Sequence, residues 1–172
     1  MITRAPISAT KRPIPMDTSF AFDQLRLLPV WEASVLLEPT QVRGPGPLGV
    51  RNIVPIVTGH FEGVIAPETD SPRRFCGTIQ PGGFDLQRER ADGMLELEAI
   101  YHMMTDDHVS IEIRNYALLE PKLDGSIGYS RCRIFVDAPD GHYAWLNRRI
   151  FTGSVEVIRP QKEVLIRSFT VV

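Results

Sequence analysis

Turn signals recur at short intervals along most of the chain, and their spacing limits its fold more than any other feature. Glycine- and proline-rich turns lie at 44–49, 67–72, 81–83, 91–93 and 137–141. The segments between them are rich in Val, Ile, Leu, Phe and Tyr, which favour strands. We predict about nine strands, over residues 30–37, 49–57, 59–65, 74–79, 94–104, 109–117, 129–136, 150–158 and 163–171. The pattern indicates one all-β domain, either a β-barrel or a β-sandwich.

One short helix is expected near the N-terminus. Residues 17–19 are good helix N-caps, apolar residues follow at 20, 22, 25 and 28, and Pro29 ends the segment. The start of the chain lacks the apolar region of a secretory signal, and its prolines favour a loose arm over a transit peptide. We therefore expect a helix near residues 18–28 and a cytoplasmic location.

The register of one hairpin, over residues 94–117, follows from its apolar residues. Residues directly opposite each other in an antiparallel pair share a face of the sheet. A two-residue loop would mix apolar and polar residues on one face, whereas a three-residue loop at 106–108 keeps one face apolar. The longer loop pairs Met103 with Ile111, Tyr101 with Ile113, and Ala99 with Asn115. It also places His108 where a left-handed residue, most often glycine, is usual.

This register sorts the polar residues of the hairpin between its two faces. Glu98, His102, Glu112 and Arg114 fall on the outer face, where a solvated cross-strand ladder is favoured over a metal site. Asn115 falls on the inner face among apolar residues, and a buried amide needs hydrogen-bond partners. Either neighbouring backbone satisfies it, or it lines a cavity that holds a ligand.

Composition excludes several function classes. Lys and Arg number 19 against 21 Asp and Glu, so the chain lacks the basic excess typical of nucleic-acid or anionic-membrane binding. No apolar run approaches the ~20 residues that cross a bilayer. Two cysteines are too few for a disulfide framework or a structural zinc site, and the four histidines share no metal-ligand spacing. We find no nucleophile elbow, phosphate loop or dinucleotide fingerprint, and we therefore expect no metal and no cofactor.

Two motifs remain: a glycine-rich turn with one acid, and an aromatic–polar segment. These two motifs are Gln80–Asp85 and Tyr143–Asn147. Together with the other turns and strand ends they form a series along the chain: Gly59–Gly63, Gln80–Asp85, Thr105–His108, Ile111–Asn115 and Tyr143–Asn147. This series resembles domain-of-unknown-function family 3237, also known as UPF0311. The family is similar in fold to small lipocalin-like barrels. The resemblance thus implies a single antiparallel closed β-barrel of about 8–10 strands over residues 25–172, after an N-terminal arm over 1–24.

Three positions depart from the family pattern. His60 replaces the usual second glycine of its motif, and Leu86 replaces an aromatic residue after the acid. His108 replaces the glycine of the hairpin, at the position where the three-residue loop requires a positive φ. The family pattern thus agrees with the register derived from the hairpin itself.

The barrel interior is the expected site of function. A closed barrel of this size has room for one small ligand, and a carboxyl group in an apolar mouth exchanges protons near neutral pH. We expect a cofactor-free isomerase, cyclase, lyase or hydrolase acting on a small organic metabolite. Asp85 would be the acid and base, Asn115 and Asn147 would hydrogen-bond the substrate, and Tyr101 and Trp145 would shape the wall.

Two other interpretations use the same residues. The barrel could be a non-catalytic carrier of a hydrophobic ligand, since fold does not decide function. Alternatively, Asp85 caps the turn after Gly82 and Gly83, and Trp145 plugs one end of the barrel.

An apolar patch on the outer face of the hairpin predicts self-association. Met94, Ile100, Met104 and Tyr116 point outward on the derived register. Either the N-terminal segment around Phe20, Phe22 and Leu25 or a second subunit must cover them. Aromatic and Met side chains suit a two-fold contact, so a homodimer is expected.

Overall fold

Strands make up most of the part of the chain that the structure describes, residues 25–172. The computed structural model contains ten strands and one short 3-10 helix, η1. The strands are β1 (Leu27–Leu37), β2 (Gln41–Gly46), β3 (Gly49–Ile65), β4 (Arg73–Ile79), β5 (Phe84–Glu89), β6 (Leu95–Thr105), β7 (Ser110–Pro121), β8 (Ile127–Asp137), β9 (Phe151–Arg159) and β10 (Glu163–Val171), with η1 at Leu146–Arg148. No helix within residues 25–172 is long and apolar enough to cross a membrane.

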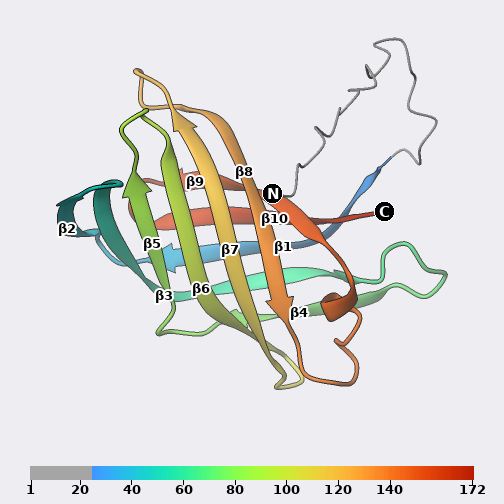
Figure 1. Cartoon of the computed structure of the whole chain (residues 1–172). Helices are drawn as coiled ribbons and strands as arrows, with labels where there is room; N and C mark the ends of the chain where they lie inside the picture. Colours follow the sequence, from blue (N-terminus) through green and yellow to red (C-terminus); the bar gives the residue numbers. More distant parts are fainter. Residues whose placement is uncertain (1–24) are drawn as a thin grey trace, which may run out of the picture.

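The antiparallel strands close into a barrel, which confirms the predicted fold class. Neighbours run in the order β1, β10, β9, β8, β7, β6, and β1 also pairs with β3. The gap between β6 and β3 is filled by two short strands, β5 toward one end of the barrel and β4 toward the other. Figure 1 shows β5 to β8 side by side on one wall, with β9, β10 and β1 crossing behind them. The wall therefore has eight positions, and β2 lies outside it, paired to β3 alone.

The β6–β7 hairpin has the predicted register. Met103 lies opposite Ile111, and Ala99 lies opposite Asn115. His108 has a φ of 65°, in the left-handed region. The outer ladder also forms as predicted, with His102 Nε2 3.8 Å from Glu112 Oε2. Apolar alternation was therefore sufficient to determine this part of the sheet.

Two predicted strands, 49–57 and 59–65, are in fact one continuous strand. Gly59 lies inside β3 rather than at a break. Glycine is needed at this position because the strand passes close to β1: a Cβ at Gly59 would lie 2.1 Å from the Ser34 carbonyl oxygen. Strands β2 and β5 were not predicted. In β5 the usual pattern is inverted, with Asp85 buried while Phe84 and Leu86 are exposed.

The predicted helix near residues 18–28 is wrong over its described part. Leu27 and Leu28 begin β1 and pair with Val171 and Thr170 of β10. Two backbone hydrogen bonds between Arg26 and Val172 extend this ladder, so pairing with β10 outweighs the local helix signal. Residues 18–24, the arm over 1–24 and its apolar residues Phe20 and Phe22 lie outside the described residues.

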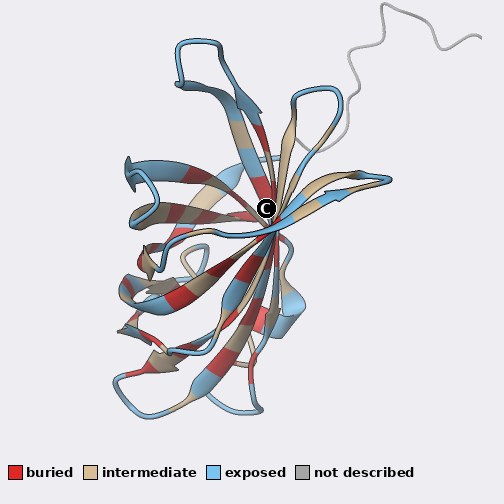
Figure 2. Ribbon diagram, turned by 90° about the vertical axis from the view of Figure 1, so that its left-hand side faces the viewer, coloured by how far each residue is buried: buried red, intermediate tan, exposed pale blue. Residues whose placement is uncertain are grey.

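The two halves of the barrel interior differ in how they are filled. Buried bands alternate with exposed ones along the strands (Figure 2), as expected for a barrel wall. Toward the end with the β6–β7 turn, aromatic rings pack against one another: Trp31 edge to face on Phe151 at 5.2 Å, and Phe61 tilted against Phe75 at 5.4 Å between centroids. Toward the other end, the inward side chains are mostly Val, Leu, Ile and Ala. The aromatic half is a packed core, and the aliphatic half encloses a cavity.

The loop from β8 to β9, which contains η1, covers the aromatic end. The Tyr143 hydroxyl donates to Asp107 Oδ1 at 2.7 Å, which ties the loop to the β6–β7 turn. The Trp145 indole N–H and the Arg149 guanidinium both donate to Glu68 Oε1 in the β3–β4 loop. These contacts hold the loop over the aromatic end, and the cavity lies in the opposite half of the barrel.

Candidate functional site

The candidate site is a row of inward side chains across three neighbouring strands. Asp85 of β5 lies opposite Ala99 of β6, and Ala99 lies opposite Asn115 of β7. Adjacent strands are about 4.8 Å apart, so the Cα atoms of Asp85 and Asn115 are separated by about 10 Å. Because the residue between them is only an alanine, space remains above its methyl group. Tyr101 follows two residues later on the same face of β6.

These residues line a cavity of about 200 Å³ in the aliphatic half of the barrel. Most of its wall is apolar and comes from β1, β3, β6, β7, β9 and β10. The lining residues are Val35, Leu37, Thr40, Val54, Ile56, Asp85, Gln87, Leu95, Leu97, Ala99, Tyr101, Asn115, Ala117, Leu119, Val155, Val157, Gln161, Val164 and Ile166. A concave, mostly apolar cavity with a few polar groups is the usual form of a small-molecule site.

Asp85 is the buried acid of this cavity. Its side chain is 7% exposed, and Oδ2 accepts a hydrogen bond from Gln87 Nε2 at 2.8 Å. Oδ1 is buried and has no partner. Burial raises the pKa of Asp85 to about 6, outweighing the hydrogen bonds from Gln87 and from the Glu98 backbone, which lower it. The group therefore changes protonation close to neutral pH, as an acid–base catalyst must.

Tyr101 and Asn115 add two further unpartnered polar atoms. The Tyr101 hydroxyl and Asn115 Oδ1 are both buried without a hydrogen-bond partner. Burial also raises the pKa of Tyr101 above its usual range, so its hydroxyl stays protonated and can donate. An unsatisfied buried polar group costs about 1–3 kcal/mol. Three such groups in one cavity are expensive for folding alone, and a ligand would satisfy them.

The turn before β5 sets the position of Asp85. Gly82 has a φ of 98°, which favours glycine. At Gly83 a Cβ would lie 2.7 Å from the Tyr101 Cβ, so only glycine lets the chain pass this close to β6. The Gly83 carbonyl then accepts from the Ile56 amide at 2.8 Å. The glycine pair thus places the start of β5 against Tyr101.

The structure does not bring Trp145 and Asn147 to this cavity. Trp145 packs on Phe151 at the aromatic end, with 6.0 Å between ring centroids, and Arg149 stacks over it. Asn147 Nδ2 donates to the Ala138 carbonyl at 2.7 Å, and its Oδ1 accepts from the Ala138 amide at 2.8 Å. Both residues hold the β8–β9 loop in place, which agrees with the interpretation of Trp145 as a plug.

Sequence reasoning missed the polar residue that contacts Asp85, Gln87. It lines the cavity two residues after Asp85 and holds one oxygen of that carboxyl group. The signal was the i, i+2 spacing of the two residues, which would have placed both on one face had residues 84–89 been recognised as a strand.

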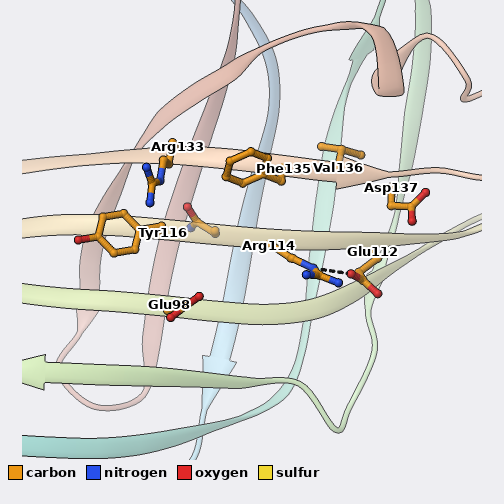
Figure 3. Close-up of a pocket in the computed structure, with 9 residues that line it drawn as sticks. Glu98, Glu112, Arg114, Tyr116, Arg133, Phe135, Val136 and Asp137 are labelled. Atoms are coloured by element: carbon orange, nitrogen blue, oxygen red, sulfur yellow. Dashed lines mark hydrogen bonds and ion pairs between the residues drawn. The ribbon is translucent and has the colours of Figure 1, made fainter. Parts of the chain in front are cut away.

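A larger groove of about 390 Å³ lies on the outer face of β6, β7 and β8 (Figure 3). Both of its arginines have partners: Arg114 Nε donates to Glu112 Oε1 at 2.7 Å, and Arg133 stacks over the Tyr116 ring at 4.5 Å. Within residues 25–172 no group of three or more His, Cys, Asp or Glu side chains could hold a metal ion. The groove is therefore a weaker candidate than the cavity, whose polar atoms lack partners.

Similar proteins share the fold. A UPF0311 protein of Rhodopseudomonas palustris is 29% identical over 119 residues, covering 62% of this chain and 71% of the relative. A crystal structure of a conserved protein of unknown function from the same species has a TM-score of 0.73 at 27% identity, covering 88% of this chain and 100% of the other. A β-barrel-like protein of Acinetobacter baumannii also has a TM-score of 0.73, at 22% identity and with 89% and 99% of the two chains covered.

A more distant structure, described as an enzyme from Penicillium herquei, has a TM-score of 0.63 at 17% identity and covers 87% of this chain and 94% of its own. This likeness extends to the fold alone. The profile of the family Protein of unknown function (DUF3237) matches residues 25–171. The match confirms the resemblance drawn from the sequence motifs: the chain belongs to the DUF3237 family.

Proposed function

We propose that the barrel binds a small organic molecule in its cavity and catalyses acid–base chemistry on it, of the isomerase, cyclase, lyase or hydrolase type. The proposal rests on the environment of Asp85. Asp85 is buried beside an apolar cavity, one of its oxygens is unpartnered, and its pKa is raised to about 6 by burial. Perturbed acids of this kind concentrate at catalytic sites.

The simplest reaction is proton transfer next to a carbonyl group. Ionised Asp85 removes a proton from the carbon beside the carbonyl, and the electron pair moves onto the carbonyl oxygen. The Tyr101 hydroxyl donates a hydrogen bond to that oxygen, and the Asn115 amide orients the substrate. Asp85 then returns the proton to the same or another carbon. The reaction is balanced without any further reactant.

The apolar wall supports this chemistry. A hydrogen bond to developing negative charge is stronger where water is excluded and the local dielectric constant is low. The Penicillium herquei structure, described as an enzyme, is consistent with catalysis in a barrel of this shape, although fold by itself does not assign function.

Hydrogen–deuterium exchange tests the proposal without a known substrate. Single-ring ketones and lactones are incubated with the protein in D₂O, and loss of the proton signal beside the carbonyl is followed by NMR. We expect exchange with the wild type and a loss of about 100-fold or more in Asp85→Asn. Asp92→Asn, which changes an exposed carboxylate paired with Arg90, is the matched control and should behave as wild type.

A second outcome would favour the carrier. If saturation-transfer NMR shows that the compounds bind and no exchange occurs, the barrel is a non-catalytic binding protein. The apolar lining of the cavity suits that function equally well.

We also propose that the outer face of β5 to β8 mediates formation of a homodimer. Phe84, Leu86 and Phe135 are 38%, 41% and 61% exposed on this face, beside the half-buried Met94, Ile100, Met104 and Tyr116. The same face carries Arg114 and Arg133 together with Glu98 and Glu112. Because both signs of charge are present, a two-fold contact can bring opposite charges together while it buries the apolar side chains.

A further inference from the structure

We propose that the cavity selects neutral single-ring molecules that carry a hydroxyl or carbonyl group, and that it rejects the corresponding carboxylates. This inference rests on the function proposed above and specifies the class of ligand. It draws on the distribution of charge around the cavity, the hydrogen-bonding capacity of its polar atoms and its size.

The cavity wall carries charge of one sign only, which is negative. Among its lining residues within the described chain, Asp85 is the only acid, and none is Lys, Arg or His. An anionic ligand would therefore lie near a carboxylate with no positive side chain in the wall to offset the repulsion. In an apolar environment this repulsion is poorly screened.

The acidic residues of β5 lie on one face of the strand, and its arginine lies on the other. Asp85, Gln87 and Glu89 alternate onto one face, and Glu89 Oε1 accepts from Asn52 Nδ2 at 3.1 Å. Arg88 alternates onto the opposite face and pairs there with Glu96 at 3.0 Å. A carboxylate moving along the inner face of β5 would thus pass a second acid before reaching Asp85.

The unpartnered atoms offer a ligand both an acceptor and a donor. Asp85 Oδ1 accepts a hydrogen bond when ionised, whereas the Tyr101 hydroxyl has a proton to donate. A hydroxyl group supplies both functions. An ammonium group supplies donors but no acceptor, so it would leave the Tyr101 proton unpartnered and would itself lose its hydration. A neutral oxygen function fits the pair better than either charged group.

The size of the cavity limits the rest of the molecule. An apolar cavity of about 150 Å³ in a different protein holds benzene. At about 200 Å³, this cavity fits one ring with one or two small substituents. Ala99 provides the free space between Asp85 and Asn115, so a larger side chain there would occupy the position of the ligand.

Three probes with the same ring test the inference: benzyl alcohol, benzoate and benzylamine. Their affinities are measured by calorimetry at about pH 8, where Asp85 is ionised. We expect benzyl alcohol to bind the wild type at least about 10-fold more tightly than either charged probe. Asp85→Asn should reduce the discrimination against benzoate, and the Asp92→Asn control should retain it. Ala99→Leu should abolish binding of benzyl alcohol, whereas Ala91→Leu, at an exposed turn position, should not.

The possible outcomes separate the two proposals. Benzoate binding as tightly as benzyl alcohol, or benzylamine binding more tightly, would overturn the selectivity. Binding of none of the three would overturn the proposed binding function itself. Selective binding of benzyl alcohol without hydrogen–deuterium exchange of any ketone would uphold the selectivity and overturn the catalytic function.

Discussion

Burial of Asp85 couples the candidate chemistry to the stability of the protein. The pKa of its carboxyl group is about 6 in the folded chain, against 3.8 when it is freely solvated. The folded state therefore holds a proton that the unfolded state releases between these two values. The stabilising contribution of Asp85 is fully present below about pH 4 and is lost as pH rises through about 6. The site is maintained at a cost in stability under the conditions where Asp85 acts as a base.

This coupling predicts how Asp85→Asn alters stability with pH. The asparagine does not titrate, so the free energy of unfolding of the variant relative to wild type should rise by about 3 kcal/mol from about pH 3 to about pH 8. Urea unfolding at several pH values measures the difference. For Asp92→Asn, the free energy of unfolding relative to wild type should fall as pH rises, because a hydrogen bond from Arg90 lowers the pKa of Asp92. A difference that is independent of pH for Asp85→Asn would mean that the carboxyl group is not desolvated.

At the scale of single elements, the β6–β7 turn sets the geometry of its hairpin. It has a histidine where glycine is usual. His108 adopts a φ of 65°, and its amide donates to the Thr105 carbonyl at 2.9 Å. The turn fixes the register that places Tyr101 and Asn115 on the inner face. A left-handed conformation costs a residue with a Cβ about 1–2 kcal/mol, whereas glycine adopts it freely.

His108→Gly should therefore stabilise the hairpin. We expect the free energy of unfolding to rise by up to about 1 kcal/mol, since the relief of strain exceeds the added entropy of the unfolded chain. His102→Gly makes the same chemical change inside β6 and should lower stability by about 1 kcal/mol. Chemical denaturation of both variants measures the contrast. Equal losses in the two would show that His108 carries no strain.

At the scale of the whole molecule, closure of the barrel leaves one broad face with exposed apolar side chains. Phe135 is the most exposed aromatic residue of that face. If two copies meet there, sedimentation at micromolar concentration should give a species of twice the 19.3 kDa chain mass. Phe135→Glu should shift it toward the monomer, because a charge would be buried at the contact. Leu123→Glu, at the fully exposed β7–β8 turn, should leave the mass unchanged.

A single 19.3 kDa species for the wild type would exclude the dimer. The N-terminal segment would then be the remaining candidate to cover the face. Repeating the measurement on a chain that lacks residues 1–24 would show whether exposure of the face leads to association.

The sequence by itself determined the all-β class, the β6–β7 register and the inward position of Asn115. These depend on the two-residue alternation of side chains, which is a local property. Tertiary structure decided the rest of the site. Strand β5 carries an acid inward and apolar residues outward, so its own alternation misleads, and only pairing with β3 and β6 shows which face is inside. Likewise, Asn147 looked like Asn115 in sequence, but the Ala138 backbone bonds both the oxygen and the nitrogen of its side-chain amide. Whether a polar side chain is left without a partner depends on neighbours distant in the chain, and those are brought together only when the barrel closes.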